Sequence, residues 1–166
     1  MTQSENGSST ESLSVLIVDD FAPIRESLHA FLTSAGHRVT VASDSNEATT
    51  LINATEFDAA IIDFEMPGPD GLILLQTIQE KYPLLPVIVV SSAINTERAI
   101  QLVNAGVFKV AWKPVDPKWL LSALVDASRI NEIRTRAASW SEPSPEETAP
   151  SQSESEPQRS QEQINA

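Results

Sequence analysis

Short apolar runs alternate five times with helical patterns along the middle of the chain. The runs are rich in β-branched residues, which favour strands. Continuous apolar runs such as VLIV and VIVV are typical of strands covered on both faces, as in a parallel sheet flanked by helices. The predicted strands are residues 15–18, 38–42, 59–63, 87–91 and 108–112.

Signals for helix starts and ends lie between these runs. Residues 44–47 have the pattern of a capping box, and Asp116 followed by Pro117 resembles an N-cap with proline in the first helical position. The predicted helices begin near residues 23, 45, 71, 96 and 117, and the last one runs to about Arg136. Because crossovers between parallel strands are right-handed, this order predicts an α/β fold with a doubly wound, five-stranded parallel sheet.

The composition limits the number of domains. With 166 residues, of which 41% are hydrophobic, the chain has material for one core, so a second folded output domain is not expected. Residues 1–12 and the Ser-, Pro-, Glu- and Gln-rich residues 137–166 contain few large apolar side chains, and we expect both segments to be disordered. The folded domain is therefore predicted at residues 13–136, in a protein that acts on its own.

Charge and cysteine content exclude several classes of function. The absence of cysteine excludes disulfides, thiol nucleophiles and Cys-based zinc sites, and a cytoplasmic location is expected. No stretch has the pattern of a targeting signal or membrane span. The net charge is −12 and no stripe of Lys and Arg is visible, so nucleic acid is not an expected partner.

Chemically capable residues follow the predicted strands. Asp19 and Asp20 come after the first strand, Asp63 ends the third, Ser91 ends the fourth and Lys113 follows the fifth. In a doubly wound sheet, ligands bind beyond these carboxyl ends. Three converging carboxylates need a compensating cation, and oxygen ligands suit Mg²⁺. Asp63 is the expected nucleophile, with Lys113 and Ser91 contacting an incoming phosphoryl group.

Four motifs in this order resemble the receiver domain of bacterial response regulators, the family of the chemotaxis protein CheY. The motifs are VDD at 18–20, DFEMPGPDG at 63–71, PVIVVSS at 86–92 and KP at 113–114. The resemblance covers about residues 14–128. It implies the strand order 2-1-3-4-5 and a signalling domain that catalyses only its own phosphorylation and dephosphorylation.

The resemblance also implies roles for single residues. Asp63 matches the phosphoacceptor, which takes its phosphoryl group from a histidine kinase or a histidine phosphotransfer protein. Asp19 and Asp20 match the acidic pair that binds Mg²⁺ with Asp63, and the backbone carbonyl of Glu65 matches a further metal ligand. Ser91 matches the switch hydroxyl. The output would be contact with a downstream protein.

Three positions stand out against the family pattern. Lys113 matches the family's lysine, with a cis peptide bond expected before Pro114, but Val110 replaces the Tyr or Phe that often precedes this lysine by three residues. We therefore expect the aromatic half of the usual switch to be missing. Glu65 and Ala93 flank the site, and we expect them to alter the access of water and donor to Asp63.

Two other functions are compatible with parts of the sequence. A receiver-like interaction module that works without phosphorylation would explain Val110. An aspartyl-phosphate hydrolase of the haloacid-dehalogenase type would explain Asp63-Phe64-Glu65, although its nucleophile would precede the metal-binding acids, the reverse of the order here. The last helix could overhang the domain and support a homodimer or another partner contact.

Overall fold

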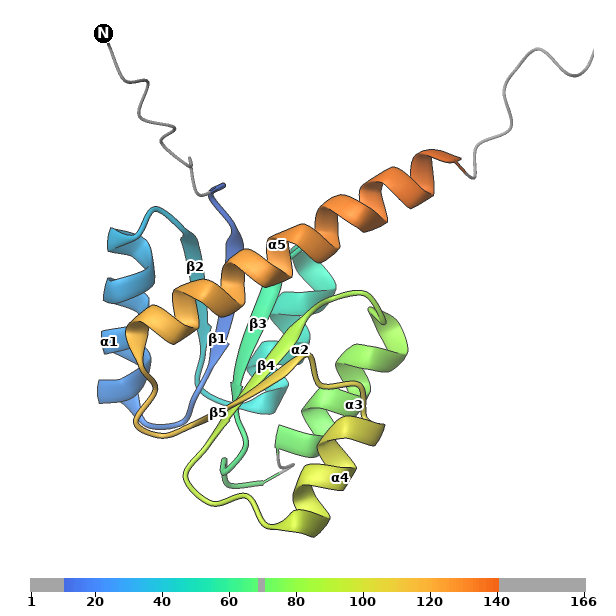
Figure 1. Ribbon diagram of the computed structural model, residues 1–166. Coiled ribbons are helices and arrows are strands. Elements are labelled where there is room, and N and C mark those ends of the chain that lie inside the picture. Colours follow the sequence, from blue (N-terminus) through green and yellow to red (C-terminus); the bar gives the residue numbers. More distant parts are fainter. Residues whose placement is uncertain (1–10, 69–70, 141–166) are drawn as a thin grey trace, which may run out of the picture.

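The computed structural model describes residues 11–68 and 71–140, in which five strands alternate with five helices (Figure 1). The elements are β1 (Ser14–Val18), α1 (Ala22–Ser34), β2 (Arg38–Ala42), α2 (Ser45–Ala54), β3 (Ala59–Asp63), α3 (Gly71–Lys81), β4 (Val87–Ser91), α4 (Thr96–Asn104), β5 (Lys109–Trp112) and α5 (Pro117–Trp140). The strands lie where the sequence predicts them.

The five strands form one parallel sheet in the order β2-β1-β3-β4-β5. This confirms the predicted doubly wound topology. The chain winds outward from β1 in one direction and from β3 in the other, so the strand order reverses between these two strands. Val18 of β1 pairs with Ile62 of β3. The residues that follow Val18 and Ile62 therefore lie at the same rim of the sheet.

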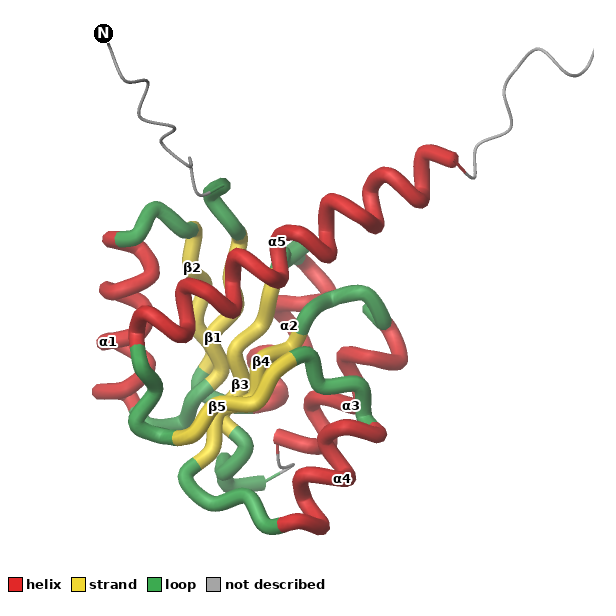
Figure 2. The backbone as a smooth tube through the Cα atoms, in the orientation of Figure 1, coloured by secondary structure: helices red, strands yellow, loops and turns green. Residues whose placement is uncertain are grey.

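Alternate residues of the strands pack into two apolar layers. In β1, Val15 and Ile17 belong to a cluster with α1 and α5, whereas Leu16 and Val18 belong to a cluster with α2, α3 and α4. Figure 2 shows the helices around the central strands. Every residue of β3 and β4 is buried, as expected for central strands covered by helices on both faces.

Side-chain caps begin the two helices for which the sequence indicates a capping residue at position 44 or 116. Asp44 accepts hydrogen bonds from the backbone N–H groups of Asn46 and Glu47, both at 2.8 Å, and Asp116 accepts one from Lys118 at 2.9 Å. The capping box differs in one detail, because the Glu47 carboxylate accepts from the backbone N–H of Ser43 at 2.7 Å. The pattern therefore predicted the helix start correctly. In a capping box the N–H group of the N-cap residue, Asp44, would donate to Glu47, whereas here the N–H group of the preceding residue donates.

The last helix extends beyond its predicted end at Arg136 and continues to Trp140. The beginning of the predicted disordered tail is thus helical, and the rest of that tail and residues 1–10 lie outside the described residues. In Figure 1 the final turns of α5 project past the sheet. Within the described ranges, no helix combines the length and apolarity that a membrane span requires.

Candidate functional site

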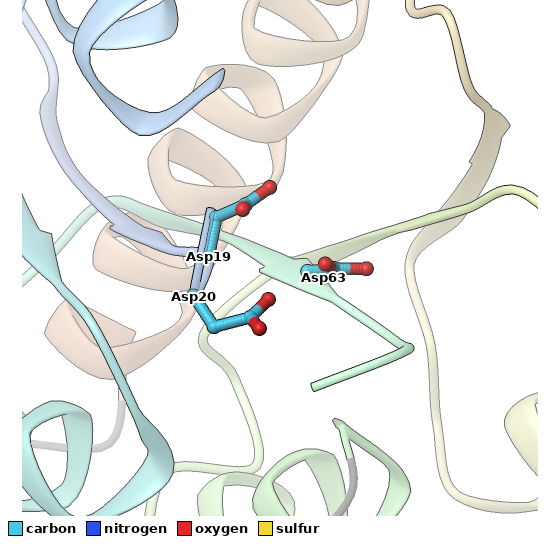
Figure 3. Close-up of side chains that lie close together, drawn as sticks. All are labelled: Asp19, Asp20 and Asp63. Atoms are coloured by element: carbon cyan, nitrogen blue, oxygen red, sulfur yellow. The ribbon is translucent and has the colours of Figure 1, made fainter. Parts of the chain in front are cut away.

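Three carboxylates converge at the rim where the strand order reverses. Asp19 and Asp20 follow β1 and Asp63 ends β3, and one oxygen from each lies within 4.8 Å of the other two (Figure 3). Asp19 and Asp63 are only 3% and 4% exposed, whereas Asp20 is exposed. The register of β1 against β3 therefore assembles the acidic cluster that the sequence predicted.

Backbone hydrogen bonds orient the two buried carboxylates. The Phe21 N–H donates to Oδ1 of Asp19 at 2.8 Å, and the Glu65 N–H donates to Oδ1 of Asp63 at 3.0 Å. In both cases the donor lies two residues after the acid, as in an Asx turn. One oxygen of each carboxylate is therefore held by the local turn, and the geometry leaves Oδ2 for other partners.

Lys113 supplies a positive charge to this cluster. Its Nζ lies 2.8 Å from Oδ2 of Asp63 and 3.5 Å from Oδ2 of Asp19. The Lys113 N–H donates to the Ser91 carbonyl at 2.8 Å, and the bond to Pro114 is cis, as predicted. Burial opposes the charged form, but the contacts with Asp63 and Asp19 outweigh it and raise the pKa of Lys113, so the side chain stays protonated at neutral pH.

The balance of charge and the type of ligand fit a divalent cation. Three carboxylates face one ammonium group, and burial raises the pKa of Asp19, with the Phe21 hydrogen bond and Lys113 opposing and the charge of Asp63 adding to the rise. With Lys113 included, the cluster still has more negative than positive charge when its carboxylates are ionised. Because all three acids offer oxygen ligands, the residues fit a hard ion such as Mg²⁺ better than a soft metal.

Ser91 is fully buried at the end of β4, and its hydroxyl contacts the side chain of Glu65. The hydroxyl donates to Oε1 of Glu65 at 3.2 Å, and the Ala93 N–H donates to the same oxygen at 2.9 Å. The sequence indicated Glu65 as a backbone ligand and a residue that tunes access to the site. Its contacts with the loop between β4 and α4 were missed, since no local pattern places residues 65 and 91 together.

The remaining predicted position, Val110, is half-buried and packs against the apolar cluster of α2, α3 and α4. It lies on β5 in register with Val89 of β4. The structure thus places an aliphatic side chain in the wall of the core, where the family often has an aromatic one. Its effect on signalling stays a prediction.

Gly71 is a further residue of the site. It ends the motif at 63–71, but the sequence alone offers no reason for a glycine at this position. A Cβ atom on Gly71 would lie 2.6 Å from the carbonyl oxygen of Asp63 and 2.8 Å from Cα of Phe64. Real Cβ atoms do not approach backbone so closely. The first turn of α3 therefore packs directly against the end of β3, and only glycine fits there.

A cavity of about 360 Å³ opens beside Asp63 and Lys113. Apolar side chains from α1 and from the segment after Lys113, including Ile24, Leu28 and Val115, also line this cavity. Space for a small molecule therefore lies next to the buried carboxylate. Together, an acidic cluster whose ligands fit a metal ion, a paired lysine and an adjoining space suit the transfer of an anionic group to Asp63.

Comparisons with known proteins point to one family. The family model "Response regulator receiver domain" matches residues 15–125. A putative NtrX-like response regulator from Rickettsia conorii is 32% identical over 124 residues, and the DNA-binding transcriptional regulator NtrC from Klebsiella pneumoniae is 36% identical over 100 residues. A CheY-like receiver domain protein from Methanospirillum hungatei has a similar crystal structure, with a TM-score of 0.69 and 27% identity over 76% of this chain and 99% of that one.

The two curated relatives are much longer than the matched region. The alignments cover 74% and 60% of this chain but only 26% and 21% of the NtrX-like protein and NtrC, respectively. The matched region therefore spans about a quarter of the length of these relatives or less.

Proposed function

The chain belongs to the response regulator receiver domain family, and we propose that Asp63 is its phosphoacceptor. The donor is a histidine kinase or a histidine phosphotransfer protein, and the reaction depends on Mg²⁺. The observation that carries this proposal is the buried Asp63 carboxylate, with Lys113 at 2.8 Å and the oxygens of Asp19 and Asp20 within 4.8 Å. A nucleophilic carboxylate, a cation and a metal-binding acidic pair are the groups that this transfer requires.

The reaction is the transfer of a phosphoryl group from a histidine nitrogen to a carboxylate oxygen. The bond between phosphorus and Asp63 forms, the bond between phosphorus and the imidazole nitrogen breaks, and the departing imidazole takes up a proton. Asp19, Asp20, Asp63 and the carbonyl of Glu65 would hold Mg²⁺, which when bound neutralises charge on the phosphoryl oxygens.

Lys113 changes partners in this scheme. Before transfer it pairs with Oδ2 of Asp63, and the acyl phosphate that forms moves negative charge from the carboxylate to the phosphoryl oxygens. A protonated lysine at this rim then pairs with the new group. Hydrolysis of the acyl phosphate returns the site to its first state, so the domain catalyses only its own phosphorylation and dephosphorylation.

We propose that the signal leaves through contact with another protein. Large apolar side chains are exposed on α4 and at the end of β5, where Ile100, Val103 and Trp112 are 56%, 71% and 58% exposed. Exposed apolar side chains of this size are typical of surfaces that bind a partner or a second copy of the chain. The net charge of −12 favours a protein over a nucleic acid as that partner.

The direct test is intact-mass measurement after incubation with acetyl phosphate and Mg²⁺. The wild-type chain should gain the mass of one phosphoryl group, and Asp63→Asn should gain none. Asp126→Asn is the matched control, because Asp126 lies on α5 in an ion pair with Lys109, outside the acidic cluster. Labelling that persists in Asp63→Asn, or that needs no metal, would contradict the proposal.

The alternative of a phosphorylation-independent interaction module rests on Val110 alone. Against it, Asp19, Asp20, Asp63 and Lys113 are all present and close together. Absence of any mass gain in the wild-type chain, with the fold intact, would favour this alternative.

A further inference from the structure

The carboxylate of Glu65 lies against the loop that joins β4 to α4 and accepts four hydrogen bonds from it. Oε1 accepts from the Ser91 hydroxyl at 3.2 Å and from the Ala93 N–H at 2.9 Å. Oε2 accepts from the Ser92 N–H at 2.9 Å and from the Ser92 hydroxyl at 2.5 Å. Both oxygens of one side chain therefore hold three consecutive residues of this loop.

These donors form an anion-binding site that Glu65 itself occupies. Successive backbone N–H groups and neighbouring hydroxyls are a common cradle for anions, and hydrogen bonds to a charged acceptor are stronger than neutral ones. Burial acts to raise the pKa of Glu65, but the bonds from Ser92, Ser91 and Ala93 outweigh it and lower the pKa. The side chain is thus an ionised ligand of the loop at neutral pH.

Ser91 connects this loop to the phosphoacceptor. Asp63 is in register with Val90, the Phe64 N–H donates to the Val90 carbonyl at 2.8 Å, and Ser91 is the next residue of β4. A hydroxyl has one proton to donate. If Ser91 donates to Glu65, it does not donate to a phosphoryl group on Asp63. The two anions would also repel each other across the same donors.

We propose that Glu65 is a positioning residue that holds Ser91 and the β4–α4 loop in the unphosphorylated arrangement, and that phosphorylation acts by displacing its carboxylate. This inference rests on the proposed phosphorylation of Asp63. By stabilising the first arrangement, Glu65 lowers the population of the second arrangement, in which Ser91 is free to contact a phosphoryl group. The apparent affinity of the site for a phosphoryl group is reduced by the same factor.

The displaced loop would transmit the change to α4. The loop leads into Asn95, whose side chain caps α4 by accepting from the Arg98 N–H at 2.8 Å. The guanidinium carbon of Arg98 lies 5.1 Å from the ring centroid of Phe64, the residue between Asp63 and Glu65. Release of Glu65 therefore removes one connection between the phosphoacceptor segment and the start of α4, whereas the contact of Phe64 with Arg98 can remain.

The test uses the full chain with Mg²⁺ and beryllofluoride, an analogue of a phosphoryl group that binds a carboxylate. Ser92→Ala removes one hydrogen bond to Glu65 and leaves the charge of the site unchanged, whereas Glu65→Gln removes the charge. Each variant should lower the half-saturating beryllofluoride concentration about two- to twelvefold, since a hydrogen bond contributes about 0.5–1.5 kcal/mol. In the double variant, the gain in free energy of beryllofluoride binding should be smaller than the sum of the gains in the two single variants, because the two residues form one contact.

Two control variants separate this effect from surface chemistry. Ser34→Ala removes an exposed hydroxyl at the end of α1 that donates to the Phe31 carbonyl, and Glu97→Gln removes an exposed charge in the first turn of α4. Both should bind beryllofluoride as the wild type does. Without the probe, the amide proton resonances of Ser92 and Ala93 should move upfield in Glu65→Gln, since their charged acceptor is lost.

The outcomes distinguish the two proposals. If the wild type binds no beryllofluoride, the proposed function fails and the role of Glu65 fails with it. If the wild type binds and Ser92→Ala does not change the half-saturating concentration, the inference about Glu65 is overturned while the proposed function stands. If Ser92→Ala binds beryllofluoride as the wild type does but Glu65→Gln binds it more tightly, Glu65 weakens binding through charge repulsion alone and not by holding the loop.

Discussion

The Nζ atom of Lys113 lies 2.8 Å from Oδ2 of Asp63, so the residue after β5 is joined by charge to the last residue of β3. The two side chains are 18% and 4% exposed. An ion pair that is largely shielded from water is coupled more strongly than a surface pair, and removal of one partner leaves the other charge uncompensated.

Replacement of Lys113 by Ala should therefore slow phosphorylation of Asp63. A hydrogen bond to a charged group contributes about 1.5–3 kcal/mol, so the rate with acetyl phosphate should fall at least about tenfold. Lys109→Ala is the control, because Lys109 begins β5, the strand that Lys113 follows, but pairs with Asp126. Wild-type rates in Lys113→Ala, measured by intact mass over time, would exclude Lys113 from the reaction.

Mg²⁺ should raise the free energy of unfolding, because a ligand of the folded state stabilises that state. At an Mg²⁺ concentration about ten times the dissociation constant, the gain should be about 1.4 kcal/mol, and chelation should reverse it. Asp63→Asn should weaken the response by removing one ligand, whereas Asp126→Asn should retain it. Urea unfolding with and without Mg²⁺ measures this, and an equal response in both variants would place the ion elsewhere.

Gly71→Ala should destabilise the domain through the contact of its new Cβ with the end of β3. The added atom would lie 2.6 Å from a backbone oxygen, and such overpacking costs about 1–3 kcal/mol. Gln76→Ala, an exposed position on α3, is the matched control and should change stability by less than about 0.5 kcal/mol. Equal unfolding midpoints for the two variants would show that the backbone relaxes freely at Gly71.

His37 should make the stability of the domain fall in mildly acidic solution. His37 is 4% exposed, its Nδ1 accepts the Leu13 N–H at 3.3 Å, and burial lowers its pKa below the usual 6.5. Below pH 6.5 the unfolded chain therefore binds a proton that the folded chain does not, so the free energy of unfolding decreases as the pH falls through this range.

Urea unfolding at several pH values tests this expectation. His37→Asn should flatten the dependence on pH, whereas His29→Asn, at an exposed position of α1, should behave as the wild type does. If His37→Asn keeps the full dependence, other groups cause it.

The sequence by itself determined the elements and the rim on which the chemistry lies. Buried parallel strands need apolar side chains on both faces, so VLIV and VIVV were readable without a structure. Asp44 and Asp116 cap the backbone of the next few residues, which makes helix starts a local property. Asp19, Asp63 and Lys113 were predictable as neighbours, because the carboxyl ends of parallel strands meet at one edge.

Tertiary structure alone decided where Glu65 points and why Gly71 is needed. Glu65 contacts Ser91, Ser92 and Ala93, which lie 26 to 28 residues away in the sequence, and no periodicity records such a contact. Glycine is needed at position 71 because a Cβ there would meet the backbone of Asp63 and Phe64, and this close approach is set by the packing of α3 on the sheet. Local patterns specify the backbone of each element, whereas the partners of a side chain depend on how the elements pack together.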